Sequence, residues 1–156
     1  MTRNRKNKSR RLGLTAVELA MVLPILFTMV MGLFEGGSAY YSWLTVQKAA
    51  QVGARFAATG RGEDEGTRLN QIIATTEAGL TTLTHGTTEV TVRSWPDLNA
   101  VGDGINGNPG APCQMAEVAV LYNYKPFTPI VAALLPDTIP LHGYDRKVNE
   151  PWKPCD

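Results

Sequence analysis

LGLTAVELAMVLPILFTMVMGLF, residues 12–34, is the most apolar stretch of this chain, and Glu18 is its only ionisable side chain. A helix rises about 1.5 Å per residue, so these residues would extend about 34 Å. A hydrocarbon core of about 30 Å can be crossed by a helix of that length, whereas the buried helices of soluble proteins are usually shorter. The stretch therefore predicts one membrane-spanning helix, which we assign to residues 14–37.

The residues before this stretch are strongly basic. Within the first eleven positions there is no acidic residue, and there are six basic ones: Arg3, Arg5, Lys6, Lys8, Arg10 and Arg11. Basic residues beside a span stay on the cytoplasmic side of the membrane. We therefore expect the N-terminus inside and the remainder of the chain outside. The arm's place beside the span already accounts for its charge, so we expect no nucleic-acid partner.

Two residues at the start of the apolar stretch bear on function. Gly13 stands where the basic arm gives way to apolar sequence, and Glu18 follows it closely. A carboxylate within a span costs at least about 2.5 kcal/mol at mid-bilayer and normally marks function or pairing. Near the cytoplasmic interface a carboxylate is tolerated, so Glu18 alone leaves both interpretations open. A secretory signal would be cut at small residues after the apolar stretch, and residues 36–39 keep that alternative open.

Residues 10–60 resemble the type IV prepilin signal, and specifically the TadE-like minor pseudopilins of tight-adherence (Flp) pilus systems. The resemblance is carried by RRLGLTAVE and LAMVLP within residues 10–24, and by AAQVGAR at residues 49–55. In that family a prepilin peptidase cuts after the glycine that corresponds to Gly13, which leaves Leu14 as the new N-terminus. The resemblance also implies that Glu18 meets the free N-terminal amine of a neighbouring subunit, a pairing that would lower the cost of its charge.

The resemblance implies a structural function, that of a minor pseudopilin which assembles in a Tad-type pilus through its N-terminal helix. The implied partners are the prepilin peptidase, the inner-membrane Tad platform proteins, and other pilins such as TadF-like proteins and the major Flp pilin. The implied location is the bacterial inner membrane, with a leader at residues 1–13 and a periplasmic domain at 38–156. The alternative function is a signal-anchored periplasmic binding or scaffold module outside pilus biology.

Three small or helix-bending residues lie in or beside the span. Pro24 is tolerated within a membrane helix, where neighbouring helices can absorb the lost hydrogen bond. Gly32 and Gly36 have the spacing that lets another helix approach closely. We assign all three residues to assembly; the alternative for the glycines is a chance occurrence of their spacing, which is frequent in membrane spans.

The remainder of the chain predicts an α+β domain. Apolar residues with a period of 3.6 continue through residues 46–57, so one helix should extend from about Thr15 to Ala58 and change from apolar to amphipathic. A second helix is predicted at about residues 63–83, where the early acidic residues suit the helix dipole. Alternating patterns predict a small antiparallel sheet of about three strands, at Glu89–Arg93, Met115–Tyr124 and Ile139–Val148.

Two segments between the predicted strands were interpreted from composition. Residues 97–113 are rich in Gly and Asn and predict a surface loop. The oxygen donors Asp103, Asn106 and Asn108 do not have the spacing of a calcium loop, so we predict no metal site. The apolar residues 126–136 are too short to span the bilayer. They favour a short helix that covers the sheet, with an exposed patch for a partner pilin as the alternative.

The cysteines and histidines point to a structural protein. Cys113 and Cys155 are the only cysteines, and both fall on the side assigned to the oxidising compartment, so we predict a disulfide between them. His85 and His142 have no patterned catalytic partner. Together with the cysteines they also lack the close spacing of a zinc site. We therefore predict no enzymatic activity and no cofactor.

Overall fold

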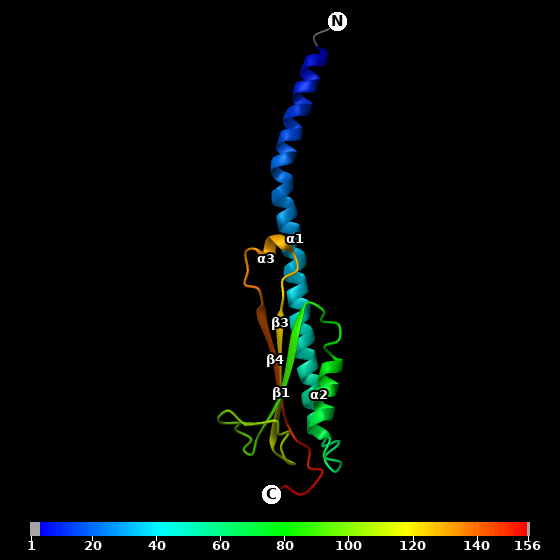
Figure 1. Cartoon of the computed structure of the whole chain (residues 1–156), viewed down its shortest axis with the longest axis vertical. Helices are drawn as coiled ribbons and strands as arrows, with labels where there is room; N and C mark the ends of the chain where they lie inside the picture. The colour runs from blue at the N-terminus through cyan, green and yellow to red at the C-terminus, as the bar shows by residue number, and fades with distance from the viewer. Residues whose placement is uncertain (1–3, 156) are drawn as a thin grey trace.

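The computed structural model describes the backbone of residues 4–155 and the side chains of residues 16–155. A long helix, α1 (Asn4–Ala58), carries a small domain along its C-terminal half (Figure 1). The domain contains helices α2 (Arg68–Ala78) and α3 (Pro129–Ala132), and strands β1 (Gly86–Trp95), β2 (Ile105–Asn106), β3 (Met115–Tyr124) and β4 (Ile139–Val148). The predicted α+β class is confirmed. Arg3 of the basic arm lies outside the described residues.

Helix α1 passes without interruption from the apolar stretch into the domain. It continues through Pro24, although proline removes one backbone hydrogen bond. The helix ends at Ala58, as the periodicity predicts, because the following Gly60 takes a φ of 67°, which glycine adopts without strain. The membrane-spanning pattern and the domain-packing pattern therefore belong to one rigid element.

Helix α2 is shorter at both ends than the predicted helix at residues 63–83. The residues before it form a turn in which the N–H groups of Thr67 and Arg68 donate to the carbonyl of Gly62, at 2.9 and 3.0 Å. Gly62 itself has a φ of 80°, which a continuing right-handed helix cannot contain. At the other end, Gly79 closes the helix and turns follow it. The apolar spacing therefore extends beyond the helix into turns that bury Leu80.

The four strands form one antiparallel sheet in the order β2-β1-β3-β4. The bounds of β3 and β4 are those predicted, while β1 is longer at both ends because its terminal residues pair fully with β3. Strand β2 is an addition within the predicted loop at residues 97–113, where it pairs with Arg93 and Ser94. It is too short to have a recognisable alternating pattern.

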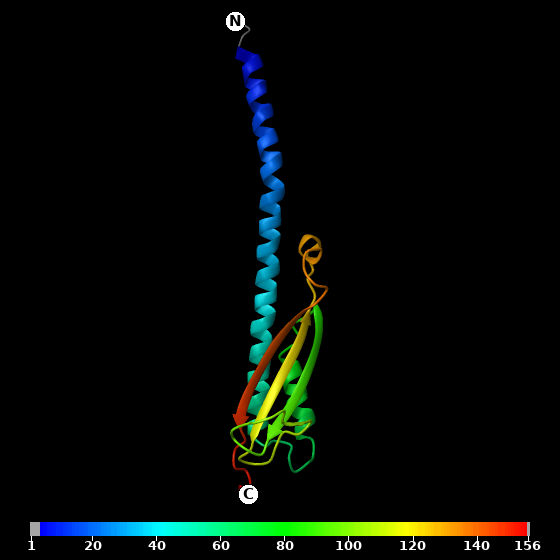
Figure 2. The same cartoon turned by 90° about the vertical axis from the view of Figure 1, so that its left-hand side faces the viewer.

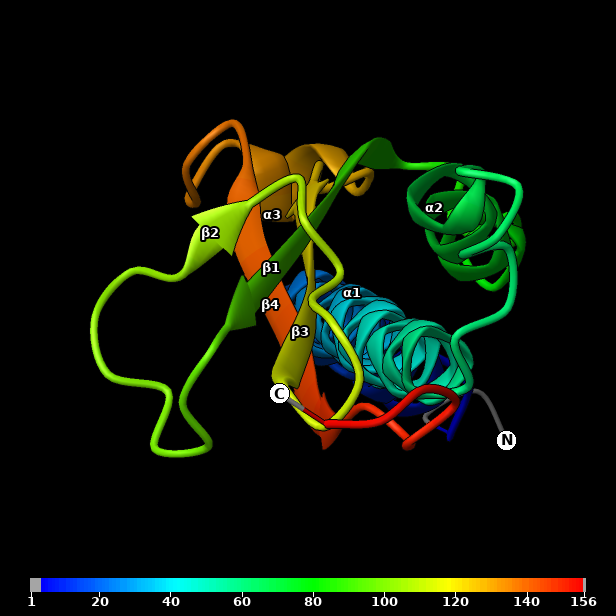
Figure 3. The same ribbon diagram turned by 90° about the horizontal axis from the view of Figure 1, so that it is seen from below.

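Helices α1 and α2 cover one face of the sheet and leave the other face without a helix (Figures 2 and 3). The core lies between these layers and is built from Val46, Ala49, Ala50, Ala54, Ala57, Ile72, Leu80, Val92, Ala116, Val118, Val120, Tyr122 and Tyr124. The alanines let α1 approach the sheet closely. Gly53 has the tightest surroundings among the α1 glycines of the described part, because a Cβ there would collide with the Thr76 hydroxyl and lie 3.1 Å from a Val118 methyl group. The Ala-Ala-x-x-Gly-Ala-Arg segment thus has a packing role.

The expectation that residues 126–136 cover the sheet is wrong. Helix α3 lies beside α1, beyond the ends of the strands (Figures 1 and 2). The inner face of the sheet is already occupied by α1 and α2, so the segment packs at the edge of this layer. Its larger side chains remain exposed, with Leu134 at 78%.

Candidate functional site

Between residues 16 and 34, helix α1 presents apolar side chains around its whole circumference. The large exposed ones are Val17, Leu19, Met21, Val22, Leu23, Ile25, Leu26, Phe27, Met29, Val30, Leu33 and Phe34. The most apolar 18-residue window has a mean hydropathy of 2.2, and none of it is buried within the chain. In the described residues this is the one helix long and apolar enough to cross a membrane. A helix that is apolar on every side needs lipid or other helices around it.

The residues predicted to act in processing and assembly lie along this part of α1. Gly13 and Leu14 are within its helical backbone, and their side-chain surroundings lie outside the described part. Glu18 is exposed among apolar neighbours. No side chain of residues 16–155 forms an ion pair with it. Its predicted pairing with a neighbouring subunit stays a prediction.

Pro24, Gly32 and Gly36 occur along the same exposed helix. The Thr28 hydroxyl donates to the carbonyl of Pro24 at 2.8 Å. This adds a side-chain hydrogen bond to the helical turn that follows the proline. In the described chain, nothing lies within 4 Å of a Cβ built at Gly32 or Gly36. These glycines therefore do not pack against their own domain, and their predicted helix contact would have to be with another chain.

Glu35 is a buried carboxylate that sequence reasoning did not single out. It directly follows the apolar stretch at residues 12–34 and lies within the last turn of the predicted span at residues 14–37. Its side chain is nonetheless buried and faces the end of β3. Tyr124 donates its hydroxyl proton to Oε1 at 2.5 Å, and Thr128 donates to Oε2 from its N–H at 3.0 Å and its hydroxyl at 2.6 Å. The Phe127 N–H approaches Oε1 at 3.3 Å.

These donors satisfy both oxygens of a charge that would be costly to bury alone. Burial, reinforced by the bond to Glu35, raises the pKa of Tyr124 to about 12, so its hydroxyl keeps its proton at neutral pH. The cluster ties the end of β3 and the start of the α3 segment to α1. It therefore fixes the junction between the apolar helix and the domain.

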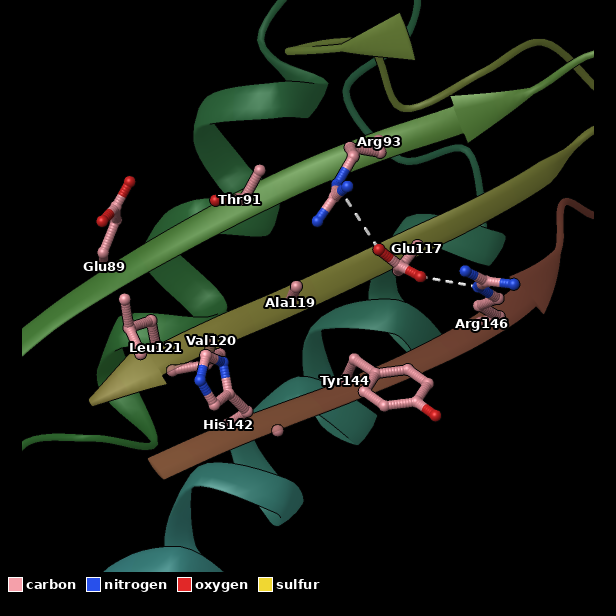
Figure 4. Close-up of a pocket in the computed structure, with 11 residues that line it drawn as sticks. Glu89, Thr91, Arg93, Glu117, Ala119, Val120, Leu121, His142, Tyr144 and Arg146 are labelled. Atoms are coloured by element: carbon pink, nitrogen blue, oxygen red, sulfur yellow. Dashed lines mark hydrogen bonds and ion pairs between the residues drawn. The ribbon is translucent and has the colours of Figure 1, made fainter. Parts of the chain in front are cut away.

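The open face of the sheet carries a groove of about 480 Å³. In Figure 4, Glu117 of β3 lies between Arg93 of β1 and Arg146 of β4. Its Oε2 accepts from Nε of Arg146 at 2.6 Å, and its Oε1 is 3.5 Å from Nε of Arg93. Arg146 also lies over the Trp95 ring, at 4.7 Å from its centroid. The two arginines share the one carboxylate of Glu117, so this trio keeps a net positive charge.

The groove resembles a binding surface more than a catalytic centre. His142 and Tyr144 line it from β4, and in Figure 4 Tyr144 lies near Arg146 while His142 lies farther along the strand, beside Leu121. Within the described residues, no cluster of His, Cys, Asp and Glu side chains could hold a metal ion. Asp103, Asn106 and Asn108 lie outside the groove.

The end of the domain away from the membrane helix is closed by the C-terminal tail (Figure 1). The structure joins Cys113 and Cys155 as a disulfide with their Cα atoms 5.8 Å apart, a usual separation for such a bond. Between them, the N–H of Glu150 donates to the last carbonyl of α1, that of Ala58, at 2.8 Å. Trp152 lies over the guanidinium of Arg68 at 4.4 Å. The tail therefore fastens the end of α1 to the loop before β3.

Comparison with known proteins finds a family match for the N-terminal part of the chain. Residues 13–55 match the family described as TadE-like protein. The matched segment begins at Gly13 and includes Glu18, the apolar part of α1 and the small core residues Ala49, Ala50, Gly53 and Ala54. The resemblance to TadE-like proteins is therefore confirmed for this segment. Neither a curated protein nor a solved structure matches the chain.

Proposed function

We propose, from the premise that residues 13–55 are TadE-like, that this chain is a minor pseudopilin, a structural component in the assembly of a Tad pilus. The family match and the single apolar helix support a membrane protein associated with the Tad pilus. The exposed apolar half of α1, continuous with a folded domain, carries the proposal. Such a helix can be held in lipid before assembly and packed among other pilin helices afterwards.

Processing follows from the position of Gly13. A prepilin peptidase removes residues 1–13 on the cytoplasmic side, and Leu14 becomes the N-terminus of the mature chain. The helix then holds the protein in the bacterial inner membrane by a single pass, with residues 38–156 in the periplasm. The uninterrupted helix through residues 36–39 supports this cut over a secretory cut after the span, because it continues directly into the domain.

Assembly uses the exposed side chains of the helix. The Glu18 carboxylate, surrounded by apolar side chains, pairs with the N-terminal amine of a neighbouring subunit. Gly32 and Gly36 allow close approach of a partner helix. The partners are TadF-like proteins, the major Flp pilin and the Tad platform proteins. The role is structural, with no catalysis and no cofactor of its own.

The decisive experiment is mass analysis of the N-terminus of the mature chain from native membranes. We expect it to begin at Leu14, and we expect the Gly13→Leu variant or a strain without the peptidase to retain residues 1–13. A wild-type chain that retains its leader, or that begins after residue 36, would contradict the proposal. The Gly13→Leu variant leaves the span and domain unchanged and therefore serves as the matched control.

A second experiment tests the assembly role of Glu18. We expect Glu18→Leu to reduce co-purification with other pilins and pilus output, while Glu77→Leu on the exposed side of α2 leaves both unchanged. If Glu18→Leu behaves like the control, the assembly role of this carboxylate is wrong.

The alternative is a signal-anchored periplasmic binding or scaffold module. The groove on the open sheet face favours it, because helices α1 and α2 leave this surface free for a partner. A mature chain that keeps its leader and does not associate with pilins would select this alternative.

A further inference from the structure

The connection between β3 and β4 is an apolar protrusion. No residue from Pro126 to Pro136 is ionisable, whereas Lys125 and Asp137 flank the segment. Its exposed large side chains are Phe127, Ile130, Leu134 and Leu135. Of the helices and strands described, only α1 contacts α3. We call residues 127–135 the apolar tip.

Two observations place the apolar tip along α1. Thr128, at its base, makes two hydrogen bonds to Glu35. Met31 lies one turn earlier on the same side of α1 and is partly buried, whereas Gly32 to Phe34 are exposed. Figures 1 and 2 show the tip beyond the strands, on the side of the N-terminal half of α1. It therefore lies beside the last turns of the predicted span at residues 14–37.

Most backbone N–H groups of the apolar tip have an acceptor. Phe127 and Thr128 donate to Glu35, and the prolines have no N–H group. Four more N–H groups donate to carbonyls within the tip, those of Ala132, Ala133, Leu134 and Leu135. Ile130 and Val131 stand in the first helical turn, where N–H groups lack an intrahelical partner. Because lipid cannot satisfy backbone groups, this arrangement suits the water-containing boundary of a bilayer better than its centre.

We propose that the apolar tip inserts into the boundary of the lipid bilayer that α1 crosses, in the leaflet on the domain's side. The inference rests on the membrane span and not on the pilus role. Its apolar surface is continuous with the lipid-facing surface of α1. Lys125 and Asp137 would stay at the level of the headgroups, as charged residues do beside interfacial apolar segments. The domain would thus be attached to the membrane at two points.

The test uses the full chain in vesicles of phosphatidylethanolamine and phosphatidylglycerol, at a protein-to-lipid ratio low enough to keep copies apart. A spin label is attached to Leu134→Cys, and to Val101→Cys in the loop after β1 as a matched exposed control. The native cysteines are joined to each other and do not react. We expect the Leu134 label to be relaxed more by oxygen, which enters lipid, than by a water-soluble nickel chelate. The Val101 label should show the reverse order.

A label at Leu135→Cys provides a second reporter. Adding Leu134→Asp to this variant should make the nickel chelate relax the label more than oxygen does, as expected for a label in water. If the nickel chelate relaxes the labels at Leu134 and Leu135 more than oxygen does, the proposal is overturned. A label shielded from both reagents also overturns it, because protein rather than lipid would then cover the tip. Retention of the N-terminal leader would leave this result unaffected, so failure of the processing proposal is distinguishable from failure of this one.

Discussion

The hydroxyl of Tyr124 lies 2.5 Å from Oε1 of Glu35, across a sequence separation of 89 residues. Tyr124 is the last residue of β3, and Glu35 stands at the end of the apolar half of α1. The bond therefore connects the sheet directly to the membrane helix. Thr128 occupies the second oxygen of the same carboxylate, so the connection between β3 and β4 shares this attachment.

Removing the Glu35 carboxylate should destabilise the domain. Glu35→Ala leaves the Tyr124 and Thr128 donors buried without an acceptor, and an unsatisfied buried group costs about 1–3 kcal/mol. We expect a loss of that size in the free energy of unfolding, measured by denaturation in detergent micelles. The exposed Glu77→Ala should change it by less than about 0.5 kcal/mol. Equal stability of the two variants would show that the cluster does not support the fold.

The stability of the domain should fall in alkaline solution because of Tyr124. Its pKa of about 12 in the fold lies above the ordinary 10.0, so the folded chain holds the phenolic proton more tightly than the unfolded chain. This contribution is complete below pH 10 and is lost as the pH rises towards 12. Subtracting the tyrosinate absorbance of Tyr124→Phe from that of the wild type should give a midpoint near 12. A midpoint near 10 would contradict the buried hydrogen bond. The pKa of Tyr122 is also raised by burial. Because Tyr122 is present in both proteins, its absorbance is removed by the subtraction.

Gly53→Ala should destabilise the protein although alanine favours helices. The gain in helix propensity is about 1 kcal/mol, but a methyl group at Gly53 collides with Thr76 and presses on Val118. Overpacking of this kind costs about 1–3 kcal/mol. We expect a net loss of stability, whereas Gly66→Ala, where space is open, should act only through backbone strain at its φ of 66°. A more stable Gly53→Ala protein would mean that α1 and α2 can separate without cost.

Breaking the disulfide should loosen the end of the domain away from the span. Cys113 and Cys155 are 42 residues apart, and closing a loop of this length stabilises a fold by about 4 kcal/mol in the chain-entropy model. We expect reduction, or Cys155→Ser, to lower the free energy of unfolding by up to that amount. Mass analysis of the native chain without reductant provides the direct check. Two free thiols in the native chain would refute the pairing.

Long local patterns predicted much of this fold. The end of α1 and the bounds of β3 and β4 follow from periodicities that extend over whole elements. The ends of α2 were mispredicted because Gly62 and Gly79 interrupt the helix while the apolar spacing continues through the neighbouring turns. Strand β2 was missed because two residues cannot show alternation.

The relationships that position the candidate site depend on contacts between distant residues. Glu35 meets Thr128 across 93 positions, and neither residue belongs to a pattern that marks the pairing. The place of α3 follows from this contact, so composition alone could not distinguish a helix on the sheet from one beside α1. In contrast, the TadE-like resemblance could be identified because the residues that carry it form short contiguous sequences.

Helix α1 has no break between its apolar part and the domain. A rotation of the apolar part about the helix axis therefore rotates the domain by the same angle. Each residue of an α-helix turns the chain by about 100°. One residue inserted between Glu18 and Pro24 would therefore rotate the open sheet face by about 100° relative to a neighbour that holds Glu18, whereas seven residues, close to two full turns, would nearly restore its direction. If a neighbouring subunit binds Glu18, the number of helical residues after Glu18 thus sets the direction in which the sheet faces.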